Sequence, residues 1–345
     1  MTKLSLSSIP SRWRVLVAFA AIYTIWGSTY LAIRFAIETT PPFLMGGARY
    51  LIAGAILYAL TRRQRATPIL RVHWRSAFVV GGLLLLGGNG GVIWAEQVIP
   101  SGLAALIIAT VPLWMALLNW LRGDKVRPNL GVTLGLVLGL LGIVFMVSPG
   151  ESAGGDNVNS LGVLVLVLAA LSWSIGSLYS RKAQLPSEPL LATAMEMLAG
   201  GALLLVAGLL TGEAGQLRLD QVSPRSLLAL GYLIVFGSLV GFSAYVWLLR
   251  VSTPARVSTY AFVNPVVAVF LGWTLAGESL TPRTLVAAAV IVTAVVLIVA
   301  NQARTTPRPT GEATPIGDRE SELRRIVTPI EGRALRRRIE ADGSN

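Results

Sequence analysis

The sequence predicts an all-α membrane protein of ten transmembrane helices, arranged as two inverted repeats of five helices each. Three observations carry this prediction: charged residues are scarce, ten long apolar stretches follow one another, and the second half of the chain repeats the first. Of the 345 residues, 13% are charged, 54% are hydrophobic and none is Cys. A soluble domain carries about 25% charge. The composition therefore excludes a soluble globular protein, and the missing Cys excludes thiol catalysis and disulfide scaffolds.

The ten apolar stretches each have the length of a membrane crossing, which takes roughly 20 mostly apolar residues. The first is too long for a cleavable signal peptide, so we expect it to remain as the first span. The stretches are 14–36, 43–60, 76–95, 102–121, 129–147, 161–180, 190–210, 226–249, 256–276 and 284–300.

The placement of positive charge predicts the orientation of these spans. With the N-terminus inside, the inner segments hold 24 of the 29 Lys and Arg residues and the outer segments hold three. Cytoplasmic segments carry the excess of Lys and Arg in membrane proteins. Ten spans then place both termini in the cytoplasm. The net charge of +12 is a signal of topology, and we expect no nucleic-acid partner.

The two halves of the chain align with each other. Offsets of 147 and then 153 residues match Trp26 with Trp173, Arg34 with Arg181, Gly54 with Gly201, Gly88 with Gly241, Trp94 with Trp247 and Pro112 with Pro265. We assign the first repeat to 13–148 and the second to 160–302. Five is an odd number, so the second repeat enters the membrane the other way up, as in transporters whose halves exchange roles. We expect residues 303–345 to form a mobile cytoplasmic tail without a role in transport; contact of its Arg residues with anionic lipid is the alternative.

Three segments resemble a known family. They are WGSTYLAIRFA at 26–36, GNGGVIWAEQVIPSGLAALIIATVP at 88–112, and the hairpins beginning Gly123-Asp124 and Gly277-Glu278. They are similar to EamA-type transporters of the drug/metabolite transporter superfamily, and the second segment is similar to the YedA-like bacterial exporters. This resemblance implies ten helices around a central cavity and export of amino acids, related metabolites or drugs across the inner membrane.

Ionisable residues inside a membrane are costly and often functional. We single out Arg49, Glu96 and Glu196. Arg49 is either a structural partner for backbone carbonyls or a charge that faces a cavity, and Glu196 has similar alternatives. A difference in depth of roughly 12 Å argues against a direct pair. Glu96 ends the third stretch, where a solvated position is the simpler interpretation. Arg34 is expected to extend its head group to the membrane surface, or else to attract an anion. If transport is coupled to protons, Glu96 or Glu196 must titrate.

Paired interruptions of helices in the two halves indicate a site near the middle of the membrane. The candidates are Gly88 and Gly241 in the third and eighth stretches, and Pro112 and Pro265 in the fourth and ninth. Pro frees a backbone carbonyl and bends a helix. Close packing of helices explains some of the Gly residues equally well.

Aromatic and small polar residues of these stretches are the candidates for lining a substrate cavity, where a few polar groups converge between apolar walls. They are Trp26, Ser28, Tyr30, Asn89, Trp94, Trp114, Trp173, Tyr245, Trp247, Tyr260 and Asn264. A further stripe, Gly131, Gly135 and Gly139, is expected to pack against a neighbouring helix, within the chain or across a homodimer.

We therefore expect a secondary transporter that moves a small-molecule substrate across the lipid bilayer by alternating access. The sequence has no Walker-type phosphate loop, and we expect no cofactor, no metal and no catalytic residues. The alternative is a polytopic membrane enzyme acting on lipid-linked substrates. A channel or scaffold is the third class.

Overall fold

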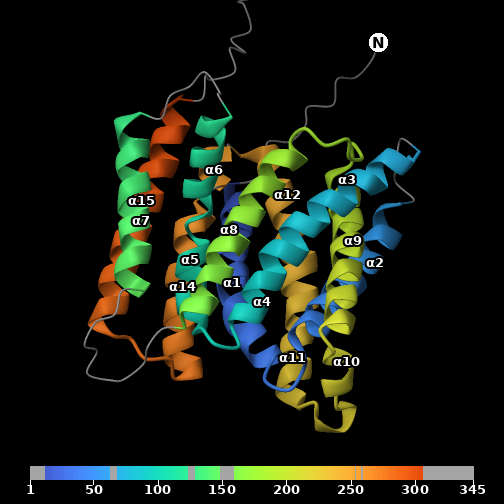
Figure 1. Ribbon diagram of the computed structural model, residues 1–345. Helices are drawn as coiled ribbons and strands as arrows, with labels where there is room; N and C mark the ends of the chain where they lie inside the picture. The colour runs from blue at the N-terminus through green and yellow to red at the C-terminus, as the bar shows by residue number, and fades with distance from the viewer. Residues whose placement is uncertain are drawn as a thin grey trace, which may run out of the picture. The chain divides into compact units, whose positions relative to one another are not determined.

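A computed structural model describes residues 12–62, 68–122, 129–147, 159–252, 254–257 and 259–305 (Figure 1). In these ranges every regular element is a helix and there is no strand. Contacts divide the chain into residues 1–303 and 304–345, and the fold below concerns the first unit. The predicted tail lies outside the described residues from 306 onward, as does the hairpin that contains Asp124.

The first half contains seven α-helices and one π-helix among its described residues. They are α1 (Arg12–Ala36), α2 (Pro42–Thr61), α3 (Arg71–Gly81), the π-helix η1 (Gly82–Gly90), α4 (Gly91–Ala95), α5 (Ser101–Ile108), α6 (Val111–Leu121) and α7 (Leu130–Val147).

The second half continues from α8 and contains a second π-helix. Its elements are α8 (Ser160–Ser180), α9 (Pro189–Leu210), α10 (Glu213–Gln216), the 3-10 helix η2 (Leu219–Gln221), α11 (Pro224–Tyr232), the π-helix η3 (Leu233–Val240), α12 (Gly241–Val251), α13 (Pro254–Val257), α14 (Tyr260–Ala276) and α15 (Pro282–Thr305).

Helix occupies each of the ten predicted stretches. Within the described residues, eight helical segments are long and apolar enough to cross a membrane, and Leu130–Phe145 and Tyr260–Ala276 are shorter apolar helices. Large apolar side chains on α7 face outward, with Leu141 57% and Val144 62% exposed. Apolar surface of this kind is unfavourable in water, and a lipid bilayer is the medium that matches it.

Small residues let the helices pack closely. A Cβ atom added at Gly54 of α2 would come within 3.0 Å of the amide nitrogen of Leu198 in α9. The stripe on α7 packs within the chain, because Gly135 faces Ile298 of α15, and the two helices run side by side in Figure 1. The absence of a side chain is what allows such close approach in a membrane.

Two carboxylates, the buried Glu213 and the half-buried Glu278, hold two helix starts in place. Glu213 accepts hydrogen bonds from the amide nitrogens of Phe43 (3.1 Å) and Leu44 (2.9 Å) at the start of α2. Glu278, which follows α14, accepts from the amide nitrogens of Ser101 (2.7 Å) and Gly102 (3.0 Å) at the start of α5. The first amides of a helix have no partner within it, and negative charge is favoured at this end.

Candidate functional site

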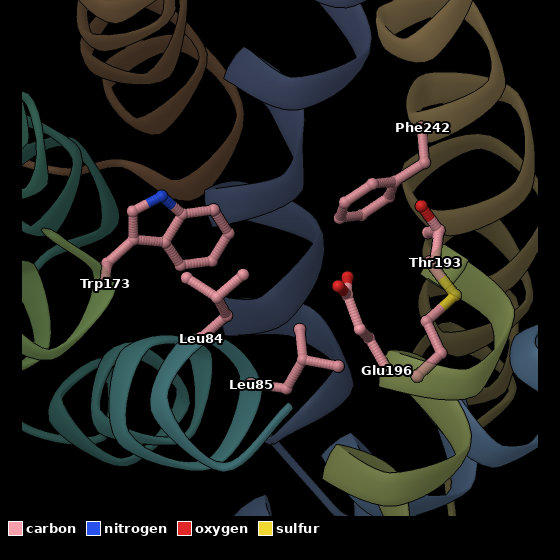
Figure 2. Close-up of a pocket in the computed structure, with 7 residues that line it drawn as sticks. Leu84, Leu85, Trp173, Thr193, Glu196 and Phe242 are labelled. Carbon is pink, nitrogen blue, oxygen red and sulfur yellow. The ribbon is translucent and has the colours of Figure 1, made fainter. Parts of the chain in front are cut away.

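A small cavity lies where α9, η1, α8 and α12 meet (Figure 2). The space open to water in it is about 20 Å³, enough for a water molecule but far below the volume of a metabolite. One of its wall residues is ionisable. The lining residues are Leu84, Leu85, Trp173, Thr193, Glu196, Met197 and Phe242.

Glu196 supplies the acidic group of this cavity. Thr193, Glu196 and Met197 lie three and four residues apart on α9, so they share one face of the helix. Figure 2 shows the Glu196 carboxylate pointing into the space between Leu84, Leu85 and Phe242. The nearby Thr193 hydroxyl donates to the carbonyl of Pro189 (3.0 Å) instead. Among the described residues, no hydrogen bond or ion pair to the carboxylate is recorded.

The π-helix η1 forms the opposite wall and supplies Leu84 and Leu85. A Cβ atom added at Gly81, directly before η1, would lie 2.5 Å from the carbonyl oxygen of Glu196. The neighbouring helix α8 bonds to the backbone of η1, because the Ser172 hydroxyl donates a hydrogen bond to the carbonyl of Leu83 (2.7 Å). Segments of π-helix are rare and frequently occur at functional sites.

An aromatic cluster adjoins the cavity and contains three predicted residues. The Trp26 ring contacts the rings of Phe242, Tyr245 and Tyr260 at centroid distances of 5.4, 5.2 and 5.2 Å. The indole nitrogen of Trp26 donates to the carbonyl of Gly237 in η3 (3.2 Å). Phe242 belongs to both the cluster and the cavity wall, so the two are continuous.

The other predicted cavity residues lie elsewhere, apart from Trp173 on the cavity wall. The Ser28 hydroxyl pairs with that of Tyr232 (2.6 Å), and the indole nitrogen of Trp114 donates to Thr110 (3.2 Å). Trp247 packs beside Leu248 and Val257. These side chains pack within the protein and do not line the described cavity.

Four more predicted residues pack within the protein or contact its backbone. Tyr30 and Trp94 pack against the main apolar core. The Asn89 amide nitrogen lies 3.5 Å from the carbonyl of Leu84. Asn264 is buried, and its amide faces the carbonyls of Tyr23 and Tyr260 at 3.3 Å each.

Glu96 corrects the expectation of a solvated helix end. Its side chain is 0% exposed, and neither carboxylate oxygen has a hydrogen-bond partner among the described residues. Arg34 was expected to extend its head group to the membrane surface. Its guanidinium instead donates a hydrogen bond to the backbone carbonyl of Glu96 (2.6 Å). After α4 the chain turns and continues as α5 from Ser101, and the order of residues along one helix does not reveal that the Glu96 side chain is buried there.

Arg49 is 3% exposed and serves as a link between helices. Its Nε donates to the Ser238 hydroxyl of η3 (3.1 Å), and its guanidinium lies 4.7 Å from the centre of the Tyr50 ring. No ion pair joins Arg49 to Glu196, both of which the structure describes. Nη1 of Arg49 has no recorded partner.

The four predicted interruptions differ in form. Gly88 lies inside η1 and Gly241 begins α12 directly after η3, so the third and eighth stretches contain a π-helix at or directly before these residues. Pro112 is the second residue of α6, directly after the turn at Ala109–Thr110. The helix α14 continues through Pro265, so the expected break does not occur at that residue.

The sequence reasoning missed Phe242, Thr193, Met197, Leu84 and Leu85 as wall residues. Thr193 and Met197 had a signal, since they share the helical face of Glu196. Phe242 follows Gly241 directly, but a single aromatic residue in an apolar helix does not by itself indicate a cavity wall.

Comparison with known proteins identifies the relatives of this chain. The EamA-like transporter family matches residues 12–148 and again residues 160–300. The uncharacterized inner membrane transporter YedA of Escherichia coli (strain K12) is 43% identical over 284 residues, which cover 81% of this chain and 89% of YedA. The uncharacterized transporter YoaV of Bacillus subtilis (strain 168) is 26% identical, covering 81% of this chain and 94% of YoaV.

Two further matches are more distant. A protein of Escherichia coli (strain K12) named "probable amino-acid metabolite efflux pump" is 24% identical, covering 79% of this chain and 90% of its own length. A solved crystal structure matches with a TM-score of 0.58 at 21% identity, covering 86% of this chain and 100% of the other. At that identity the match shows a likeness of fold alone.

Proposed function

This chain belongs to the EamA-like transporter family, and on that premise we propose that it exports small metabolites or drugs by alternating access. Amino acids and related compounds are the substrate class, in keeping with the name of the efflux pump among its relatives. The membrane is the bacterial inner membrane, as the name of YedA states for that protein. The energy source is an ion or solute gradient.

One observation carries the proposal: the contacts between α2 and α9 are reciprocal. A Cβ atom added at Gly54 would meet the Leu198 nitrogen at 3.0 Å and the Ala194 oxygen at 3.1 Å. A Cβ atom added at Gly201, the repeat equivalent of Gly54, would meet the Leu51 nitrogen at 2.9 Å and the Gly47 oxygen at 3.2 Å.

When each residue is replaced by its repeat equivalent, 147 residues away, the contacts of Gly54 become the contacts of Gly201. Gly54 becomes Gly201, while Leu51 and Gly47 become Leu198 and Ala194. Contacts of residue i with j and of j with i are what a two-fold relation requires. They support two inverted repeats of five spans, 13–148 and 160–302, related by an axis in the membrane plane.

The paired π-helices support the same arrangement. η1 lies in the third span and η3 in the eighth, and the offset of 153 residues makes them overlap. Irregular helices in corresponding places of two repeats point to the region where a transporter binds its substrate. Because each half contains one, either half can bend while the other stays straight.

The excess of Lys and Arg on the inner segments supports ten crossings with both termini in the cytoplasm. Under this topology the contact of Glu278 with the start of α5 lies at the outer end and joins the second repeat to the first. It must open when the cavity opens outward. A homodimer is compatible with the exposed face of α7, although the Gly stripe of that helix is occupied by α15.

A disulfide lock tests the proposal, because the native chain has no Cys. The double variant Ser101→Cys/Glu278→Cys places two thiols where the present contact lies. We expect metabolites that accumulate in the medium of wild-type cells, compared with cells that lack the protein, to stop appearing when the lock is oxidised. They should return on reduction. Each single Cys variant is the control for loss of the Glu278 contact.

Two results contradict the proposal. The first is export by the oxidised lock at the rate of the reduced one. The second is an unchanged profile of the medium, across amino acids, metabolites and added drugs, whether the protein is present or absent.

A further inference from the structure

The carboxylate of Glu196 has no role in packing that the structure reveals. It points into the cavity, and no hydrogen bond or ion pair to it is recorded among the described residues. A charged group in a membrane is costly unless it is paired. Glu213 and Glu278 show the contrast, because each caps the start of a helix. Glu196 therefore lacks a partner that its environment requires.

The surroundings of Glu196 favour a positively charged partner. The rings of Trp173 and Phe242 line the same cavity, and the remaining walls are Leu84, Leu85, Met197 and Thr193. The face of an aromatic ring attracts a cation, most strongly where water is excluded. An acidic group in an apolar cavity that aromatic rings also line is an arrangement that suits an ammonium ion.

Among the side chains that the structure describes on the surrounding elements, the cationic ones are turned elsewhere. Arg49 of α2 donates to Ser238, while Arg71 and Arg75 of α3 are exposed. His73 accepts from the Leu70 amide nitrogen (3.3 Å). The tyrosines of α2, α8 and α12 are likewise engaged or exposed: Tyr50 under Arg49, Tyr58 against Trp74, Tyr179 at 38% exposure and Tyr245 against Trp26.

We propose that Glu196 binds either the ammonium group of a small amine or a proton, so that the protein exchanges one for the other. When the amine binds, the carboxyl O–H bond breaks and the proton leaves to the cytoplasmic water. When the amine departs on the outer side, the carboxylate takes a proton from the outer water. One monovalent cation moves out for each proton that moves in. The cavity must widen beyond its present size to hold the amine, which the π-helix η1 in its wall allows.

This inference deepens the proposed function, since only the direction of movement depends on alternating access. Binding and proton release are measured on the full-length protein in detergent, without transport. The probe is benzyltrimethylammonium, whose nitrogen carries no proton, so any proton released comes from the protein. Its neutral counterpart, neopentylbenzene, has carbon in place of nitrogen and serves as the control for apolar binding.

We expect the wild-type protein to bind the cation and to release up to one proton for each cation bound, in a weakly buffered solution that is mildly acidic. Glu196→Gln should weaken binding about 10- to 100-fold, the factor expected for a hydrogen bond or contact to a charged group, and should release no proton. Glu196→Asp keeps the charge and should keep proton release. Glu38→Gln removes an exposed carboxylate paired with Arg225 and is the matched control.

Infrared difference spectroscopy identifies the group that loses the proton. Addition of the cation should remove a protonated-carboxyl band in the wild-type protein and in Glu38→Gln, but not in Glu196→Gln. A well-folded Glu196→Gln protein that binds the cation as tightly as the wild type overturns the proposal. Equal binding of the neutral control, or failure of the wild type to bind the cation, overturns it as well. Normal binding and proton release by a protein that exports nothing would instead count against the proposed function alone.

Discussion

The close approach of α3 to α9 makes Gly81 the position where a single methyl group should have the largest effect. A Cβ atom added there would lie 2.5 Å from the backbone carbonyl oxygen of Glu196 and 2.8 Å from the amide nitrogen of Gly200. Both are backbone atoms, so no side chain can rotate away. Ordinary contact begins at 3.4 Å, and the two helices must therefore separate by about 0.9 Å. Overpacking of this kind costs about 1–3 kcal/mol.

Thermal unfolding of purified Gly81→Ala in mild detergent measures this cost. Gly231→Ala is the matched control, because Gly231 lies in α11 of the equivalent eighth span and an added Cβ meets nothing within 4 Å. There, Ala should stabilise the helix by up to about 1 kcal/mol. We expect Gly81→Ala to unfold at a lower temperature than the wild type and Gly231→Ala at an equal or higher one. Equal midpoints for the two variants would refute the packing described for α3 and α9.

Three further outcomes are expected. Trp26→Phe keeps the ring contacts but loses the hydrogen bond to Gly237, so the protein should lose about 1 kcal/mol of stability; no loss in detergent unfolding would show that the bond is not formed. Arg34→Gln removes the donor to the Glu96 carbonyl beside a buried carboxylate and should cost about 1.5–3 kcal/mol, whereas the exposed Arg225→Gln should cost less than about 1 kcal/mol; equal losses contradict the burial of Glu96. Deletion of 306–345 should leave export unchanged, and a truncated protein that inserts normally but exports nothing overturns the passive tail.

The helices were predictable because their apolar length is a property of the local sequence. Each of the ten stretches is occupied by helix. The sequence did not predict that the irregular segments would be π-helices. The Gly residues at 87, 88, 90 and 91 indicate only that the helix is irregular there. The neighbours that contact this π-helix, such as Gly200 and Ser172, are distant in the sequence.

The site was harder to predict because it depends on which face of each helix turns inward. Phe242 lines the cavity, while the predicted Trp247 is five residues further on, which is about 140° around the helix. Trp247 therefore packs on another side of α12. Glu196 was predictable from its rarity, as one of few acidic residues within an apolar stretch. The burial of Glu96 depends on the packing of several elements around it, which its position at the end of an apolar stretch does not specify.

Thiol labelling in intact cells tests most directly the claim that the two halves are inverted copies. Glu38 and Gln184 are both exposed and occupy the same place in the two repeats to within one residue, and the native chain has no Cys. A membrane-impermeant reagent should label Glu38→Cys in intact cells and Gln184→Cys only after the cells are opened. Labelling of both variants in intact cells, or of neither, would contradict the inverted repeat and with it the alternating-access mechanism.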